Sequence, residues 1–90
     1  MRAVNIIVKG KVQGVGFRNF IETKASKLNL NGYVKNCPSG EVEIWAEGIE
    51  SELLHLIEYA RKGSLFSKVT HVDVSWIEPT YKINGFSITG

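Results

Sequence analysis

The sequence predicts an α+β fold in which an antiparallel sheet carries two helices on one face. Apolar residues alternate along several short segments, which is typical of strands with one buried face. In two longer segments they recur every three or four residues, which is typical of amphipathic helices. The composition, 43% hydrophobic and 22% charged over 90 residues, is that of one globular domain and argues against disorder.

The first half of the chain predicts a strand, a helix and a hairpin. Residues 4–9 alternate, and from Phe17 a helical stripe follows, made of Phe17, Phe20, Ile21, Ala25 and Leu28. Residues 31–36 and 41–47 predict antiparallel strands around a turn at 38–40, with proline early and glycine late. On these strands Asn36 should share a face with Val34, and Trp45 should lie on the face open to water.

The second half predicts a helix and two strands. Residues 49–62 have helical apolar spacing, acidic residues early and Arg61-Lys62 late, just before Gly63. Residues 69–76 predict a strand, which Pro79 separates from a short last strand at 86–88. The order is βαββαβ plus a strand, a ferredoxin-like sandwich, and we expect a single domain over residues 1–90.

The loop between the first strand and the first helix has the composition of an anion site. A glycine-spaced loop at a helix N-terminus directs unpaired N–H groups and the positive end of the helix dipole at one point. Gly14 and Gly16 permit positive φ and a close approach of the backbone to a ligand. Arg18 would be disfavoured by the dipole in the first turn unless it helps to hold an anion. The loop therefore predicts phosphate binding.

Two separated motifs resemble those of the acylphosphatase family. Residues 12–18, VQGVGFR, resemble its signature loop, and residues 32–36, GYVKN, followed by 40–43, GEVE, resemble a second family segment. The resemblance implies that Asn36 holds an attacking water. It also implies that phosphate is bound by Arg18 with the amides of Gln13, Gly14, Val15, Gly16 and Phe17.

The implied activity is hydrolysis of the carboxyl-phosphate anhydride bond of small acyl phosphates, with inorganic phosphate or sulfate as competing anions. The leaving carboxylate needs no general acid, and arginine with amides can stabilise the transferred group. We therefore expect no cofactor and no metal. His55 is expected to be an exposed helix residue, and His71 has no second histidine at the spacing of a metal site.

The remaining features predict a cytoplasmic monomer. The single Cys37 cannot form an intrachain disulfide, which fits a reducing compartment. The sequence has neither a signal-peptide pattern at its start nor an apolar run of the roughly 20 residues that would span a bilayer. We accordingly expect no membrane partner.

Two alternatives to an enzyme remain. The same loop could bind phosphate without catalysis inside a larger assembly, although the length of the chain argues against this. The same topology also hosts RNA-binding sheets, and Tyr33 and Trp45 could lie on an open face. A net charge of only +2 and the absence of an RNA-recognition signature argue against a nucleic-acid partner.

Overall fold

A computed structural model describes all of residues 1–90. The predicted elements are all present, and their bounds differ from the predicted ones by at most two residues at either end. Their order is β1 (Arg2–Lys11), α1 (Phe17–Lys27), β2 (Asn31–Asn36), β3 (Val42–Gly48), α2 (Glu50–Lys62), β4 (Lys68–Ile77) and β5 (Phe86–Ile88). Neither helix combines the length and the apolar composition that crossing a bilayer would require.

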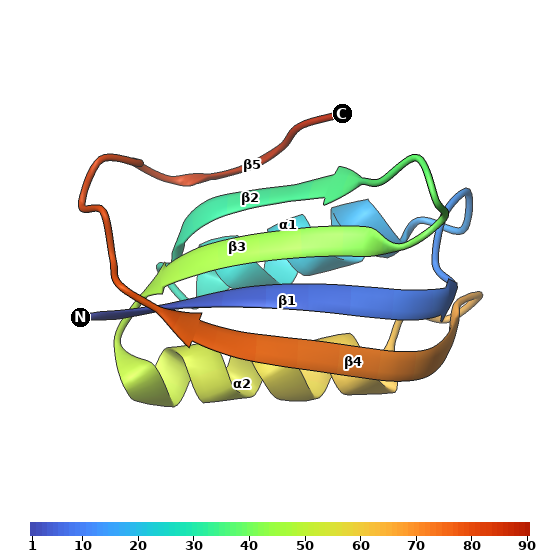
Figure 1. Cartoon of the computed structure of the whole chain (residues 1–90), viewed down its shortest axis with the longest axis horizontal. Helices are drawn as coiled ribbons and strands as arrows, with labels where there is room; N and C mark the ends of the chain where they lie inside the picture. Colours follow the sequence, from blue (N-terminus) through green and yellow to red (C-terminus); the bar gives the residue numbers. More distant parts are fainter.

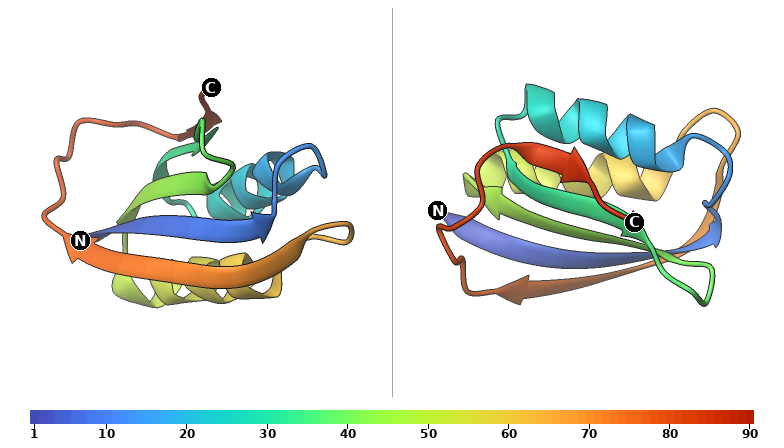
Figure 2. Two further views of the ribbon diagram at one scale, coloured as in Figure 1. Left: turned by 45° about the vertical axis from the view of Figure 1, so that its right-hand side comes forward. Right: turned by 90° about the horizontal axis from the view of Figure 1, so that it is seen from above.

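The strands form one sheet in the order β4-β1-β3-β2-β5, with both helices on one face (Figures 1 and 2). The four long strands pair antiparallel, as predicted for a ferredoxin-like fold. β5 pairs with β2 in parallel, so the complete sheet is mixed. Because β5 lies on the edge beside β2, it also contacts α1, the helix that follows the glycine loop.

The core lies between the helices and the sheet. The alternation in β1 buries Val4, Ile6 and Val8 as predicted. The α1 stripe is confirmed, since Phe17, Ile21 and Ala25 are buried, while the remaining members of the stripe pack against the core partly exposed. This packing fixes the N-terminus of α1 against the end of β1, which holds the intervening loop in place.

The helix-free face differs from the prediction. Trp45 does lie there, but only 8% of its surface is accessible, so the expectation that it faces water is wrong. Its ring stacks on Tyr33 with the centroids 6.1 Å apart. On the same face Ala3 and Glu47, which pair across β1 and β3, are also buried. The backbone of Thr80 and Tyr81 donates to Glu47, so the connection from β4 to β5 covers this part of the face.

A bulge between Lys9 and Gly10 turns the chain toward the glycine loop. The β1–β4 register shifts at this point, and Gly10 has a φ of 124°. A Cβ on Gly10 would lie 2.1 Å from the Lys68 carbonyl oxygen, so the backbones of β1 and β4 approach too closely for any other residue. Beyond the bulge, Gly10 and Lys11 still pair with β4 before the loop begins.

Candidate active site

The loop between β1 and α1 has the conformation that its glycines predict. Gly14 has a φ of 72°, and Gly16, which precedes the helix, has φ 79° and ψ 11°. Both values lie in the left-handed region, which glycine adopts without a steric penalty. The side chain of Val15 between them packs against the core and anchors the loop. The backbone on the other side of the loop is left facing outward.

The N–H groups from Gln13 to Asn19 form no hydrogen bond within the protein, either with the backbone or with a side chain. The first helical bond at this end is donated by Phe20 to the Gly16 carbonyl oxygen, at 3.1 Å. Unpaired N–H groups are ordinary in the first turn of a helix. Here the N–H groups of the loop before the helix are unpaired as well. The result is a series of donors available to one ligand.

The two helices differ in how their N-termini are charged. α2 begins with Glu50 and Glu52, which complement the positive end of its dipole. α1 has no acidic residue in its first turn and no side-chain cap, and Arg18 adds a positive charge there. An anion bound at the start of α1 would supply the missing negative charge, as a phosphate does at other helix N-termini.

A cavity of about 320 Å³ opens beside this loop. Its lining includes Gly14, Gly16, Phe17 and Arg18, all of which the sequence analysis assigned to phosphate binding. The other lining residues are Val12, Asn19 and Ile88. The volume is of the right order for a phosphate with a small attached group. Gln13, Val15 and Asn36 do not line the cavity.

Arg18 and Asn36, the two residues expected to be catalytic, are linked through a single oxygen atom. The Gly90 carbonyl oxygen accepts a hydrogen bond from Arg18 Nη1 at 2.8 Å and another from the backbone N–H of Asn36 at 3.1 Å. Arg18 lies on α1 and Asn36 ends β2, so the tail after β5 joins the two elements. The guanidinium retains further N–H donors for a ligand.

The side chain of Asn36 has an unsatisfied acceptor. Its Oδ1 is buried and forms no hydrogen bond in the structure. A buried carbonyl oxygen without a donor is costly, and an ordered water is a common partner for such an atom. The Asn36 side chain therefore has an acceptor without a partner in the protein, although Oδ1 itself has almost no accessible surface.

Gln13 has a structural contact with the hairpin. Its Nε2 donates to the Cys37 carbonyl oxygen at 2.8 Å and to the Glu41 carbonyl oxygen at 2.9 Å. The loop is thus attached to the β2–β3 turn, immediately after Asn36. The side chain of Gln13 is committed to this contact, so only its backbone N–H is free for a ligand.

Sequence analysis missed four residues of the site, namely Val12, Asn19, Ile88 and Gly90. Ile88 and Gly90 lie at the site only because β5 pairs with β2, and no local sequence pattern predicts that pairing. Asn19 directly follows Arg18 in the first turn of α1, and its position beside the loop was the one signal that could have identified it.

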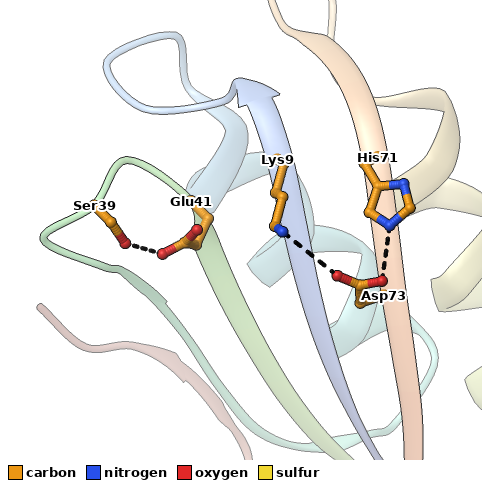
Figure 3. A network of polar contacts seen from close by, with 5 residues as sticks. All are labelled: Lys9, Ser39, Glu41, His71 and Asp73. Atoms are coloured by element: carbon orange, nitrogen blue, oxygen red, sulfur yellow. Dashed lines mark hydrogen bonds and ion pairs between the residues drawn. The ribbon is translucent and has the colours of Figure 1, made fainter.

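The other polar groups with reactive side chains lie outside the cavity. Figure 3 shows Asp73 between His71, at 2.8 Å, and Lys9, at 3.8 Å, and the separate contact of Ser39 with Glu41. All three members of the Asp73 cluster are exposed. No group of three His, Cys, Asp or Glu side chains lies close enough together to hold a metal ion.

Cys37 adjoins Asn36 but has the properties of an unreactive thiol. Burial raises the pKa of this thiol, and the nearby carboxylates of Glu43 and Glu41 raise it further. A raised pKa keeps the thiol protonated at neutral pH, and the thiolate is the nucleophilic form. Cys37 is therefore a poor nucleophile.

Comparison with known proteins supports the same assignment. The family described as Acylphosphatase matches residues 4–88. The chain belongs to the acylphosphatase family. An acylphosphatase from Bacillus licheniformis is 49% identical over 86 residues, which cover 96% of this chain and 92% of that protein. The crystal structure of acylphosphatase from Bacillus subtilis superposes with a TM-score of 0.96 at 46% identity and covers both chains completely.

The acylphosphatase fold also occurs inside a much longer protein. A full-length HypF structure in the phosphate- and nucleotide-bound form matches 99% of this chain but only 12% of its own length, with a TM-score of 0.85 and 32% identity. The agreement with acylphosphatases over nearly their full length confirms the main functional prediction, a hydrolase of this family. These matches do not favour a non-catalytic phosphate-binding or RNA-binding module. Tyr33 and Trp45, the two aromatic residues considered for RNA binding, stack on each other.

Gly14→Val should weaken phosphate binding while the protein stays folded. A Cβ on Gly14 would meet no atom within 4 Å, so the substitution creates no clash with the protein. The cost comes from the φ of 72°, which a β-branched residue strongly disfavours, so the loop should change conformation. Inhibition constants for inorganic phosphate and circular dichroism spectra would test this.

Proposed function

We propose that this chain hydrolyses small acyl phosphates by direct attack of water, with the phosphate bound at the start of α1. The observation that carries the proposal is the arrangement of Arg18 and a run of unpaired N–H groups beside one cavity. In this proposal Arg18 and the amides of Gln13, Gly14, Val15, Gly16 and Phe17 bind the phosphate oxygens. These groups would stabilise the negative charge on the transferred phosphoryl group.

Asn36 is proposed to orient the attacking water. In this proposal the side chain turns so that Oδ1, which has no partner in the protein, accepts a hydrogen bond from that water, and its amide N–H donates a second one. The water oxygen would attack phosphorus as the bond to the acyl oxygen breaks, and the electron pair would leave with the carboxylate. Positioning of this kind converts a random encounter into a defined in-line approach.

The proposed reaction needs neither a titrating side chain nor a cofactor from the protein. A carboxylate is a stable leaving group near neutral pH, so it needs no proton from a general acid. The positive charge of Arg18 and the amide dipoles would supply the stabilisation that other phosphoryl-transfer enzymes obtain partly from metal ions. We therefore propose a metal-independent enzyme, with residues 1–90 acting as one domain.

The same reasoning extends to the substrates, the competing anions, the location and the oligomeric state that we propose for the enzyme. Acyl phosphates are the substrate class that the family implies. We propose that inorganic phosphate and sulfate compete with them, because both share the tetrahedral anionic group that the loop would bind. We further propose a cytoplasmic monomer, consistent with a single cysteine whose thiol is protonated at neutral pH.

Hydrolysis of benzoyl phosphate by the purified protein tests the proposal. We expect the rate to be unchanged by EDTA, because the proposed groups are Arg18, Asn36 and backbone amides. Inorganic phosphate should inhibit competitively by occupying the loop. A rate abolished by EDTA and restored by magnesium would contradict the metal-independent mechanism, and inhibition that substrate cannot overcome would contradict the phosphate site.

A further inference from the structure

Glu47 is a buried carboxylate outside the cavity. It lies near the end of β3 on the helix-free face, and only 1% of its surface is accessible. Acidic side chains are almost never buried to this extent without partners. Its partners come from the connection between β4 and β5, residues 78–85, which we call the 78–85 connection.

The carboxylate of Glu47 accepts several hydrogen bonds from one turn of this connection. The Thr80 N–H donates to Oε1 at 2.7 Å, and the Tyr81 N–H donates to the same oxygen at 2.9 Å. The Thr80 hydroxyl adds weaker contacts at 3.3 and 3.4 Å. Bonds to an ionised acceptor are about twice as strong as neutral ones, so Glu47 is the principal attachment of this turn to the sheet.

The turn that Glu47 holds is conformationally unfavourable. Tyr81 has a φ of 60°, in the left-handed region that a bulky side chain rarely adopts. Such a conformation persists only where the surrounding contacts impose it. The Tyr81 N–H is bonded to Glu47, so the carboxylate is one of the contacts that hold this conformation.

The 78–85 connection leads directly to β5 and so to the cavity. Figure 1 shows it leaving β4 near the N-terminus, after which β5 runs back along β2 toward the other end of the sheet. Gly85 is bonded to β2, through its N–H to Asn31 Oδ1 at 2.8 Å and through its carbonyl oxygen to the Gly32 N–H at 2.9 Å. Beyond it, Ile88 lines the cavity and the Gly90 carbonyl oxygen accepts from Arg18.

We propose that Glu47 is a positioning residue for Arg18. By holding the turn at Thr80 and Tyr81, it acts together with the Gly85 bonds to β2 in fixing where β5 begins, and β5 places the Gly90 carbonyl oxygen that orients the guanidinium. Without Glu47, the tail should leave β2 for part of the time, and Arg18 should then sample orientations that do not bind phosphate. The inference rests on the proposed phosphate-binding role of Arg18.

The test compares three variants with the parent. Glu47→Leu removes the acceptors at similar volume, Glu47→Gln keeps one acceptor oxygen without the charge, and Glu78→Gln changes an exposed carboxylate of the same connection. For each we would measure kcat and KM for benzoyl phosphate, the inhibition constant of inorganic phosphate, and hydrogen exchange of the backbone amides. The apparent affinity falls in proportion to the fraction of molecules with Arg18 in place.

Glu47→Leu should raise the phosphate inhibition constant and KM by about tenfold, as expected if roughly a tenth of the molecules keep the tail bound. The Asn36 and Thr89 amides, which donate to Gly90 and Val34, should lose protection from exchange. Amides of β1 and β3 should stay protected. Glu47→Gln should change the phosphate inhibition constant, KM and the exchange protection in the same direction but by less. Glu78→Gln should behave like the parent.

A double mutant separates positioning from general destabilisation. In an Arg18→Gln background, Glu47→Leu should weaken phosphate binding no further, because the group that it positions is gone. Full additivity, or unchanged phosphate inhibition despite lost Thr89 protection, would refute the inference. If Glu47→Leu does not fold, the double-mutant cycle with Arg18→Gln is measured with Glu47→Gln instead, and the same outcomes apply. A parent that fails to hydrolyse benzoyl phosphate would instead refute the proposed function, which separates the two failures.

Discussion

Arg18→Gln is expected to lower kcat by on the order of 10³-fold or more and to weaken phosphate binding at the same time. Arginine in this position would contact the phosphate both before and during the reaction, with a charge and a fork of donors that glutamine lacks. The loss should therefore appear both in the phosphate inhibition constant and in turnover. Steady-state kinetics with benzoyl phosphate and inorganic phosphate would measure both.

Two controls distinguish this result from a loss of structure or of overall charge. Arg61→Gln removes one positive charge from the exposed C-terminal turn of α2 and should leave the kinetics unchanged. The circular dichroism spectrum of Arg18→Gln should match that of the parent, since the Arg18 side chain makes only the one hydrogen bond to Gly90. Near-parental turnover in Arg18→Gln would show that the phosphate is bound elsewhere.

Asn36→Ala should reduce kcat by roughly 10²-fold or more while phosphate inhibition stays close to that of the parent. The substitution removes the side chain whose Oδ1 lacks a partner, but it keeps the backbone N–H that donates to Gly90. The link between β2 and the tail should survive, so Arg18 should remain oriented. The expected change is the loss of the group that is proposed to orient the water.

Comparing Arg18→Gln with Asn36→Ala tests the two proposed roles more directly than either variant does alone. Arg18→Gln should alter both binding and turnover, whereas Asn36→Ala should alter turnover alone. Asn5→Ala removes an amide that is bonded to Glu43 on the helix-free face, away from the cavity, and serves as the matched control. If Asn36→Ala keeps parental turnover, Asn36 is only a strand-end residue, and another group must hold the water.

The loop at the start of α1 could be predicted from the sequence because its determinants are local. Glycine at 14 and 16 permits the left-handed backbone, the apolar stripe from Phe17 fixes where the helix begins, and Arg18 follows in the first turn. The strands, the helices and their faces follow from side-chain periodicity in the same way. The family resemblance added Asn36, for which periodicity alone predicts only the face of a strand.

Only the tertiary structure decided how the last strand completes the site. β5 has three residues, and its parallel pairing with β2 depends on contacts distant in sequence, from Glu47 to the 78–85 connection and from Arg18 to Gly90. The same connection donates hydrogen bonds to the buried Glu47, and Trp45 is buried as well, on a strand whose alternation predicts that both face water. Periodicity predicts which face of the sheet a side chain occupies. Whether that face is exposed to water depends on which distant segments of the chain pack over it.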